Sequence, residues 1–519
     1  MFNFGKKDKS DKSDNTKKAI QNKKAHYTGQ ELRQKITPLP REEFVELIKE
    51  KINTPADLIT KNISESITII FIDFLIDGNT LQQQMIPELL KMSDVTPQAI
   101  KEKLPLSQID ISNELEIVIY EMLTGSVLIH VENKSEIVIA NISSTQSRGL
   151  TAPENESQVI GSQVGFNESI ATSISLIRRF ITSPNLCNER FILGKESHTS
   201  VSLLYIKGVA SEEQVNTMRQ RIEDLDVADL VDSAVLAGLI DDSTMSVFPQ
   251  MLLTERPDRF CNALLSGKVG IMMNGSSMGI IAPMSFVEFF HSREDQNLRW
   301  QIGSLIRLLR FSAMIVSIFL TPIYVATLTY HYEVISQTLL VPLSESRAIV
   351  PFPPIMEALI LEIIIELLRE AGSRLPTKVG QTIGIVGGIV IGTAAVDAGI
   401  TSNVLIIIIA LSALASFTTP NYIMGNVIRF LRFPIIILAG IWGYYGIVLA
   451  LCFLLLHLLR LSSLGAPYLA PLYPLRFKDL SDSIIRLPSR FIKRQAVNIN
   501  KGDDEESHQQ KIEKVSENE

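Results

Sequence analysis

Three glutamates at helical spacing are the residues of this chain best suited to chemistry in an apolar setting. Glu362, Glu366 and Glu370 recur every four residues within the otherwise apolar segment 354–370. That spacing places the three carboxylates on one helix face. A carboxylate in hydrocarbon is costly unless it faces a bundle interior, water or a partner. The pattern therefore predicts a cation-attracting or proton-responsive face near a conduction path, or else an amphipathic helix in the headgroup region with solvated acids.

Four glycines recur at the same spacing in the apolar stretch that follows, at Gly380, Gly384, Gly388 and Gly392. Helices whose shared face carries no side chains approach one another closely, as in small-xxx-small packing. The residues around this face include Ile385, Val386 and Ile389, and then a single acid, Asp397. If several copies of the chain assemble, we expect this helix to line a pore whose apolar ring gates by dewetting. The alternative is an ordinary buried packing helix.

The elements that must position these residues lie in a region of low charge. Residues 311–459 carry 13 charged residues in 149, about 9%, whereas the other 370 residues carry 92, about 25%. Four uncharged stretches in that region can cross about 30 Å of hydrocarbon at about 1.5 Å per residue. They are Phe311–Tyr332, Val379–Val396, Val404–Ile428 and Phe433–Leu459, with Pro322 and Pro420 inside two of them. We therefore predict a transmembrane helical domain over residues 301–475, with four spans, or five if the glutamate helix also crosses.

Basic residues beside the spans bear on orientation, because cytoplasmic loops are enriched in arginine and lysine. Arg299, Arg307 and Arg310 precede the first span and predict a cytoplasmic N-terminal domain. A model with five spans places the loop of Arg429 and Arg432 in the cytoplasm and the basic tail outside. A model with four spans places the tail in the cytoplasm and that loop outside. We favour a cytoplasmic tail and a re-entrant or pore-side glutamate helix.

The residues before the spans predict two α/β subdomains, at 36–160 and 161–300. In the first, 66–73 has the continuous apolar character of a buried strand, and 127–131 with 137–140 predict a hairpin. In the second, 201–206 predicts a strand, Ser211 a helix N-terminus, and Asn274-Gly275 the turn of a hairpin. Residues 1–35 form a basic tail expected to be disordered, and residues 476–519 a tail that is first basic and then acidic.

The sequence carries no signature of enzymatic chemistry. It contains no GxxxxGK[ST] phosphate loop, no GxGxxG after a strand and no HExxH, and its three cysteines form no CxxC pair. A net charge of −7 argues against a general nucleic-acid binder, since phosphate neutralisation needs a basic face. We therefore predict a non-enzymatic protein without catalytic residues, cofactor, metal or nucleic-acid partner.

Several short strings are distinctive as an ordered series. Before the spans they are Ile206-Lys-Gly-Val-Ala210, Glu255-Arg-Pro-Asp258 and Gly267-Lys-Val-Gly-Ile271. Further on they include Tyr324-Val-Ala326, Val350-Pro-Phe-Pro353 with Glu357, Leu368-Arg-Glu-Ala-Gly372 and Gly465-Ala-Pro-Tyr-Leu469. Over about residues 40–475 the series resembles the A subunit of the spore germinant receptors, the GerA family. One departure is Ile160–Phe166, where the family often has an Arg-Gly-Pro-Arg-Glu-Gly-Phe type of stretch.

The resemblance implies a multi-pass subunit of a receptor in the inner membrane of the dormant spore, required for nutrient-triggered germination. A transporter-like B subunit would bind the nutrient, and a C-subunit lipoprotein would lie on the outer face. The A subunit would form a homo-oligomer and form or gate a cation-conducting pore, with its N-terminal domain facing the spore core. The alternatives are a non-conducting signalling scaffold and a secondary transporter, although the chain lacks the internal symmetry that favours a transporter.

Overall fold

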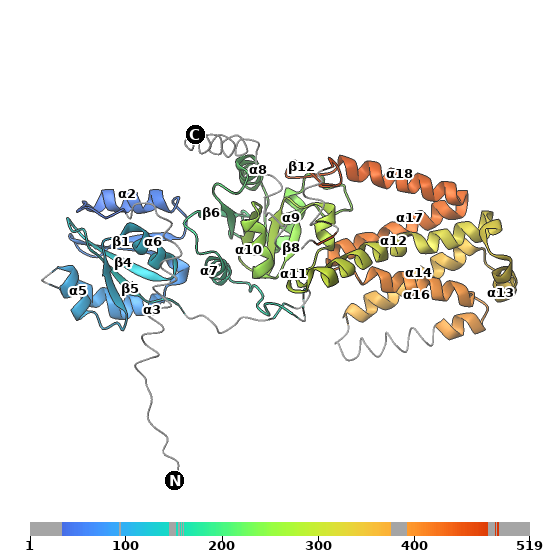
Figure 1. Cartoon of the computed structure of the whole chain (residues 1–519), viewed down its shortest axis with the longest axis horizontal. Coiled ribbons are helices and arrows are strands. Elements are labelled where there is room, and N and C mark those ends of the chain that lie inside the picture. Colours follow the sequence, from blue (N-terminus) through green and yellow to red (C-terminus); the bar gives the residue numbers. More distant parts are fainter. Residues whose placement is uncertain are drawn as a thin grey trace, which may run out of the picture. The chain divides into compact units, whose positions relative to one another are not determined.

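The chain folds into two compact units, Met1–Thr145 and Gln146–Glu519. The computed structural model describes residues 34–92, 95–144, 152–153, 156, 158, 160–374, 392–475, 483 and 485–486. The first unit is α/β, and the second joins an α/β part to a group of long helices (Figure 1). Most of the two predicted tails lies outside the described residues. The same is true of Gly380, Gly384, Gly388, Ile385, Val386 and Ile389.

The first unit is built around a five-stranded antiparallel sheet in the order β1-β2-β4-β5-β3. Its strands are β1 (Leu58–Asn62), β2 (Ile67–Ile72), β3 (Ile109–Ser112), β4 (Ser126–Val131) and β5 (Ile137–Asn141). Its helices are α2 (Arg41–Lys51), η1 (Asp73–Leu75), α3 (Gly78–Thr80), η2 (Leu81–Met85), α4 (Ile86–Leu90), α5 (Pro97–Lys103) and α6 (Leu115–Leu123). The predicted buried strand and hairpin are confirmed as β2 and as β4–β5.

Both faces of this sheet are covered, which explains why β2 is apolar at nearly every position. Ile67, Ile69 and Phe71 pack on one side, and Ile70 and Ile72 pack on the other. A strand with one wet face would alternate polar and apolar residues, whereas all six residues of β2 are buried. The continuous apolar run is therefore the expected signature of a central, doubly covered strand.

The α/β part of the second unit repeats this topology. Its sheet order is β6-β7-β9-β10-β8, which is again 1-2-4-5-3 when the strands are numbered from its own first strand. The strands are β6 (Leu186–Leu193), β7 (Thr199–Ile206), β8 (Leu252–Thr254), β9 (Val269–Met273) and β10 (Gly279–Ala282). The helices are α7 (Ile170–Phe180), α8 (Glu212–Glu223), α9 (Ser233–Ile240), α10 (Pro257–Leu265), η3 (Phe286–Phe290) and α11 (Glu294–Asn297).

The predicted elements of this part are confirmed, with one local correction. β7 and the β9–β10 hairpin lie where expected, and Gly275 in the hairpin turn has a φ of +87°. Ser211 precedes α8 as predicted, but its side chain makes no capping hydrogen bond. The helix instead begins with Glu212 and Glu213, whose charges favour the positive end of the helix dipole.

The helical region follows α11. Its elements are α12 (Trp300–Tyr330), η4 (Tyr332–Val334), α13 (Gln337–Arg347), α14 (Pro354–Arg374), α16 (Asn403–Ser416), α17 (Tyr422–Trp442) and α18 (Tyr444–Arg460). A short hairpin of β11 (Ser462–Ser463) and β12 (Ala466–Pro467) follows α18 and packs on the second α/β part, where Leu464 joins the core. Of the helices described, α12 and α17 are long and apolar enough to cross a membrane, and α16 and α18 are apolar but shorter.

Two of the predicted spans were wrong in their boundaries. Val404–Ile428 is not one helix, because α16 ends at Ser416 and α17 begins after Asn421, whose side chain caps it. Pro420 therefore lies between helices, consistent with its missing backbone donor. Phe433–Leu459 is also divided, since Gly443 has a φ of +60° and separates α17 from α18.

The sharp turn after α17 brings two backbones together at Gly446. A methyl group on Gly446 would collide with the carbonyl group of Leu438. We expect Gly446→Ala to destabilise the helical region by about 1–3 kcal/mol, because the backbone must shift to admit the methyl group. Gly372→Ala on α14 is the matched control, since a methyl group there meets open space and alanine favours helix. Thermal unfolding in detergent compares them, and equal stabilities would contradict the close approach.

Candidate functional site

A buried ion pair lies at the centre of the helical region. Nη1 of Arg432 on α17 donates to Oε2 of Glu362 on α14 at 2.6 Å, and Thr321 Oγ1 on α12 donates to Oε1 at 3.1 Å. The side chains of Glu362 and Arg432 are only 4% and 3% exposed. The predicted cation-attracting carboxylate is thus already neutralised by a guanidinium in this structure.

A fourth helix, α16, joins this site through Ser317. Arg432 Nη2 donates to Ser317 Oγ on α12 at 3.0 Å, and Ser412 Oγ on α16 donates to the Ser317 carbonyl oxygen at 3.0 Å. Polar side chains from α12, α14, α16 and α17 therefore converge on one site. Each bond supplies a partner that neither lipid nor an apolar core would offer.

The other two glutamates of the predicted face become progressively more exposed. Glu366 is 45% exposed and lies 3.6 Å from Nε of Arg429 on α17 and 3.3 Å from Arg369. Glu370 is exposed and accepts from Arg374 Nε at 2.9 Å. The three carboxylates therefore follow one another along α14, from the buried Glu362 to the exposed Glu370.

Glu357, which helical spacing sets apart from that face, has a buried site of its own. Its side chain is fully buried, and its Oε1 accepts from the Ser402 backbone N–H at 2.6 Å and from Thr401 Oγ1 at 3.0 Å. Ser402 is the N-cap of α16, so a carboxylate lies at the positive end of that helix. Arg347 Nε lies 3.7 Å from the other carboxylate oxygen. Glu357 thus ties α14 to α16.

The predicted residues beyond α14 are only partly described. Gly392 begins a described helical segment, 392–397, and a methyl group there would meet no described atom within 4 Å. Asp397, at the end of that segment, is exposed. These two residues are therefore not brought together with Glu362 in the described part of the chain.

Three arginines predicted from the sequence to lie in loops, Arg307, Arg310 and Arg432, are instead buried in helices and form ion pairs. Arg307 and Arg310 are buried on α12 and pair with Asp295, at 3.4 Å and 2.8 Å, and only Arg299 of that group is exposed. Arg432, taken as part of a short basic loop, is the buried partner of Glu362 on α17. Burial raises the pKa of Asp295, but the bonds from Arg310 outweigh it and hold that pKa below its ordinary value. Paired, buried charges of this kind are weak indicators of membrane orientation.

A second charged junction fastens the segment after α18 to the α/β part. Asp242 accepts from Ser462 Oγ at 2.5 Å, from the Leu464 and Gly465 backbone N–H groups at 3.0 and 3.2 Å, and from Arg221 at 2.6 Å. Burial raises the pKa of Asp242, but these donors together hold it below its ordinary value. The end of α18 is therefore tied to the second sheet by one carboxylate.

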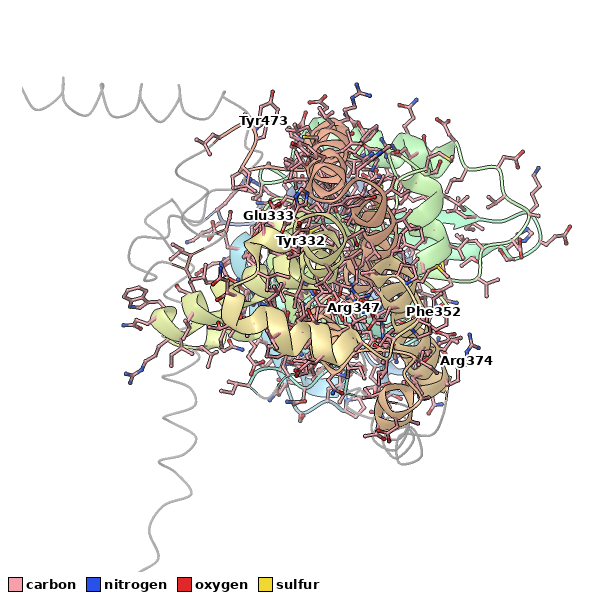
Figure 2. The ribbon with its side chains drawn as sticks, turned by 90° about the vertical axis from the view of Figure 1, so that its right-hand side faces the viewer. Tyr332, Glu333, Arg347, Phe352, Arg374 and Tyr473 are labelled. Carbon is pink, nitrogen blue, oxygen red and sulfur yellow. The ribbon has the colours of Figure 1, made fainter. Side chains whose placement is uncertain are left out.

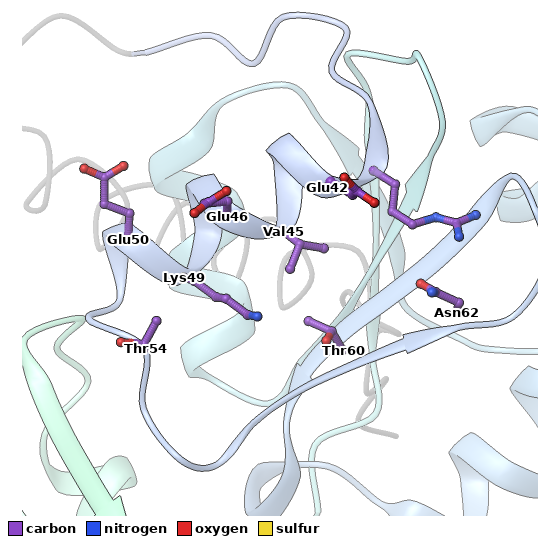
Figure 3. Close-up of a pocket in the computed structure, with 9 residues that line it drawn as sticks. Glu42, Val45, Glu46, Lys49, Glu50, Thr54, Thr60 and Asn62 are labelled. Atoms are coloured by element: carbon purple, nitrogen blue, oxygen red, sulfur yellow. The ribbon is translucent and has the colours of Figure 1, made fainter.

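The first unit contains a shallow groove. It has a volume of about 590 Å³ and lies between α2 and β1 (Figure 3). Figure 3 shows Lys49 directed toward Thr60, with Glu42, Glu46 and Glu50 along the helix. These charges of mixed sign do not converge on one point. Among the described residues, no group of three histidine, cysteine, aspartate or glutamate side chains is placed to hold a metal ion.

A family model described as Bacillus/Clostridium GerA spore germination protein matches residues 46–497. The chain belongs to the GerA family. It is 43% identical to spore germination protein GerQA of Bacillus cereus over 451 residues, covering 86% of this chain and 90% of the relative. It is 36% identical to spore germination protein KA of Bacillus subtilis (strain 168), covering 85% and 83%.

A solved structure also resembles part of this GerA-family chain. It is the N-terminal domain of the A subunit of the Bacillus megaterium spore germinant receptor GerK3, with a TM-score of 0.40 and 23% identity. The match covers 49% of this chain and 99% of that domain. The sequence relatives place the chain in the germinant-receptor A-subunit family, which acts in spore germination.

The arginine partners of Glu362 and Glu366 were not predicted from the sequence. Arg432 lies 70 residues from Glu362, so no local pattern on α14 reveals the pair. The signal available was the spacing of Arg429 and Arg432, which are three residues apart and so share a helix face. Two charges of each sign at similar helical intervals allow the two helices to pair, and the structure shows that the pairing is antiparallel, with Glu362 beside Arg432 and Glu366 beside Arg429.

We expect Glu357→Ala to destabilise the helical region by about 1–3 kcal/mol, because it leaves the buried donors of Thr401 and Ser402 without an acceptor. Glu345→Ala on α13 is the control, since Glu345 is exposed. Thermal unfolding of the full chain in detergent measures both variants. Equal midpoints would show that the carboxylate of Glu357 does not hold the start of α16.

Asp241 should make the stability of the protein depend on pH, and Asp241→Asn should remove that dependence. Burial, reinforced by the charge of Asp242, raises the pKa of Asp241 to about 6. Because the folded state then binds a proton more tightly than the unfolded state, stability falls as the pH rises from about 4 to about 6. We expect Asp241→Asn to melt higher than the parent at pH 7.5, with the gain shrinking toward pH 4. The exposed Asp229→Asn is the control, and a gain independent of pH would contradict this assignment.

Proposed function

We propose that this chain is an integral-membrane, non-enzymatic A subunit of a spore germinant receptor, and that its helical region forms or gates a cation-conducting pore. The observation that carries the proposal is that the helical region buries charged side chains and exposes large apolar ones. Glu362 and Arg432 are buried within the helices, whereas Leu305, Ile407 and Phe453 are each more than half exposed. A helical bundle in water exposes its charges and buries its large apolar side chains, so a lipid setting fits these helices better.

Exposed aromatic side chains at the two ends of the helices support this setting. At the end where Tyr330 donates to the Ile441 carbonyl oxygen, at 2.8 Å, they are Tyr330, Tyr332, Trp442 and Tyr445 (Figure 2 labels Tyr332). At the other end, between α16 and α17, they are Phe417 and Tyr422. Tyrosine and tryptophan favour the membrane–water interface. The 21 residues of α17 span about 31 Å, which matches a hydrocarbon core of about 30 Å.

The proposed cation path follows the glutamate face of α14. The open end of that face would attract cations through Glu366 and Glu370, with Asp397 as a further acid, and Glu362 would act at the buried end. We propose that the glycine helix packs closely through Gly380, Gly384, Gly388 and Gly392. Its gate would be formed by Ile385, Val386 and Ile389. The exposure gradient from Glu370 to Glu362 supports a path that narrows with depth.

The proposed assembly and topology complete this function. The chain would cross the spore inner membrane four or five times, with both α/β parts on the spore-core side. It would act as a homo-oligomer beside a transporter-like B subunit, which binds the nutrient, and a C-subunit lipoprotein. Nutrient binding on the partner would then shift the helices of this chain and release monovalent cations.

A second function, the non-conducting scaffold, is favoured by one observation. Glu362, Glu366 and Glu370 each have an arginine within 4 Å. A compensated carboxylate attracts a cation less strongly than a free one, because the arginine already neutralises its charge. In that case the helical region would anchor the soluble parts and relay movement without carrying ions.

Cation efflux separates the two functions. Liposomes containing the chain with its B and C partners are loaded with potassium, and efflux is followed before and after addition of candidate nutrients. We expect nutrient-triggered efflux that is strongly reduced by Glu362→Gln with Glu366→Gln, because the path loses two carboxylates and Arg432 also loses its buried partner. Glu366→Gln alone is included because its half-exposed site tolerates an amide, and we expect it to reduce efflux in part.

The control for efflux is Glu345→Gln, an exposed acid on α13 outside the glutamate face. It should leave efflux unchanged. Undiminished efflux in both the single and double variants, with nutrient bound, would remove the glutamate face from the path. Absence of efflux from the intact three-part receptor would favour the scaffold.

A further inference from the structure

One loop of the second α/β part presents an apolar tip. Between α9 and β8 the chain forms a turn closed by the Ser246 N–H, which donates to the Ser243 carbonyl oxygen at 3.2 Å. Met245 at the corner of this turn is 93% exposed, and Val247 beyond it is 44% exposed. Among the described residues, Met245 is the most exposed large apolar side chain, so it lies fully open to whatever surrounds this loop.

The base of the loop is firmly built. Gln250 is fully buried, and its amide both accepts from the Ser243 N–H at 2.9 Å and donates to the Ser243 carbonyl oxygen at 2.8 Å. Phe248 is buried, and its N–H donates to Ser246 Oγ at 3.1 Å. The loop is thus held at both ends, and the exposure of Met245 is a property of a defined conformation.

The loop touches the last turn of α18. Ser246 Oγ lies 2.9 Å from Nε2 of His457, and the ring of Phe248 lies 5.9 Å from the His457 ring, centre to centre. His457 is itself exposed, so the loop meets α18 on an outer face of that helix. This contact fixes the tip of the loop at the level where α18 ends.

The side chains on the last turns of α18 indicate which medium surrounds the loop. Leu456 and Leu459 on the last turn of α18 are 57% and 43% exposed, and Phe453, one turn before His457 on nearly the same face, is 71% exposed. Arg460, the final residue of α18, is also exposed. An apolar helix surface that ends in histidine and arginine is the pattern of a helix leaving the hydrocarbon at the headgroup level.

We propose that the loop Ser243–Val247 inserts Met245 and Val247 into the lipid interface beside the end of α18. This inference rests on the proposed membrane function, since it takes α18 to lie in the bilayer. The hydrogen bond to His457 holds the loop beside α18, and the exposed Phe453 lies one turn before His457 on nearly the same helix face. The medium that covers Phe453 would therefore extend to the loop that carries Met245. The second α/β part thereby gains a membrane contact in addition to its two chain connections to the helices.

Site-directed fluorescence tests the insertion in the full chain. Cys187 and Cys261 are buried, and Cys452 on α18 is exposed, so an environment-sensitive thiol dye on the parent chain reports Cys452. In a Cys452→Ala background, Met245→Cys reports the loop. Ile192→Cys is the matched control, since Ile192 is 68% exposed on the edge strand β6. Each is reconstituted in vesicles with aqueous iodide as quencher, or with lipids brominated near the headgroup or further down the acyl chain, because Cys452 lies about 12 Å before the end of α18.

We expect the dye at 245 to lose most of the iodide quenching seen at 192 and to be quenched by brominated lipid, as the dye at 452 is. Lipid quenching at 452 combined with iodide quenching at 245 would overturn the insertion and leave the membrane function standing. Iodide quenching at 452 would overturn the membrane function itself. Shielding at 245 from both quenchers, in vesicles that also contain the B and C subunits, would assign the loop to a protein partner and refute lipid contact.

Discussion

The helical region depends on one buried pair of opposite charges. Removing a carboxylate and a guanidinium from water costs several kcal/mol each, and close pairing with further hydrogen bonds is what offsets that cost. Glu362 and Arg432 are paired in this way, with Thr321 and Ser317 as additional partners. Because these four residues come from α12, α14 and α17, the three helices must keep the same relative register for the charges to remain satisfied.

The ends of the helical region are fixed by the same kind of interaction. At the start of α12, Asp295 pairs with Arg307 and Arg310, and after α18 Asp242 receives the hairpin that follows. The second α/β part is therefore connected to the first and the last of the described long helices through carboxylates that are largely buried. Moving the start of α12 or the end of α18 away from the second α/β part would break charged hydrogen bonds. The helix ends and the α/β part are therefore expected to move together. This is the mechanical property that a receptor subunit needs.

Much of the fold could be predicted from sequence because its signals are local. The apolar run of β2, the two hairpins and the common face of Glu362, Glu366 and Glu370 all follow from periods of two or four residues. The helix boundaries in the apolar region could not be predicted in this way. Long runs of leucine and isoleucine carry no periodic signal. Proline and glycine are tolerated inside membrane helices as well as between them, so Pro420 and Gly443 did not by themselves mark the breaks found in the structure.

The candidate site was harder to predict than the fold, because its chemistry depends on distant partners. A glutamate at helical spacing predicts a face, but only tertiary structure brings Arg432 from 70 residues away to neutralise it. Arg307 and Arg310 show the same effect, since both look like loop charges in the sequence and are buried partners of Asp295 in the structure. The role of a charged residue in an apolar region therefore depends on its partner in the tertiary structure.

The most direct test of this account is a double-mutant cycle across the central pair, read as thermal stability of the full chain in nanodiscs. The variants are Glu362→Gln, Arg432→Met and the two combined. The account predicts that each single change destabilises by about 3–5 kcal/mol and that the double variant recovers much of this loss, since no buried charge is left unpaired. Small, additive effects of the two changes would contradict it.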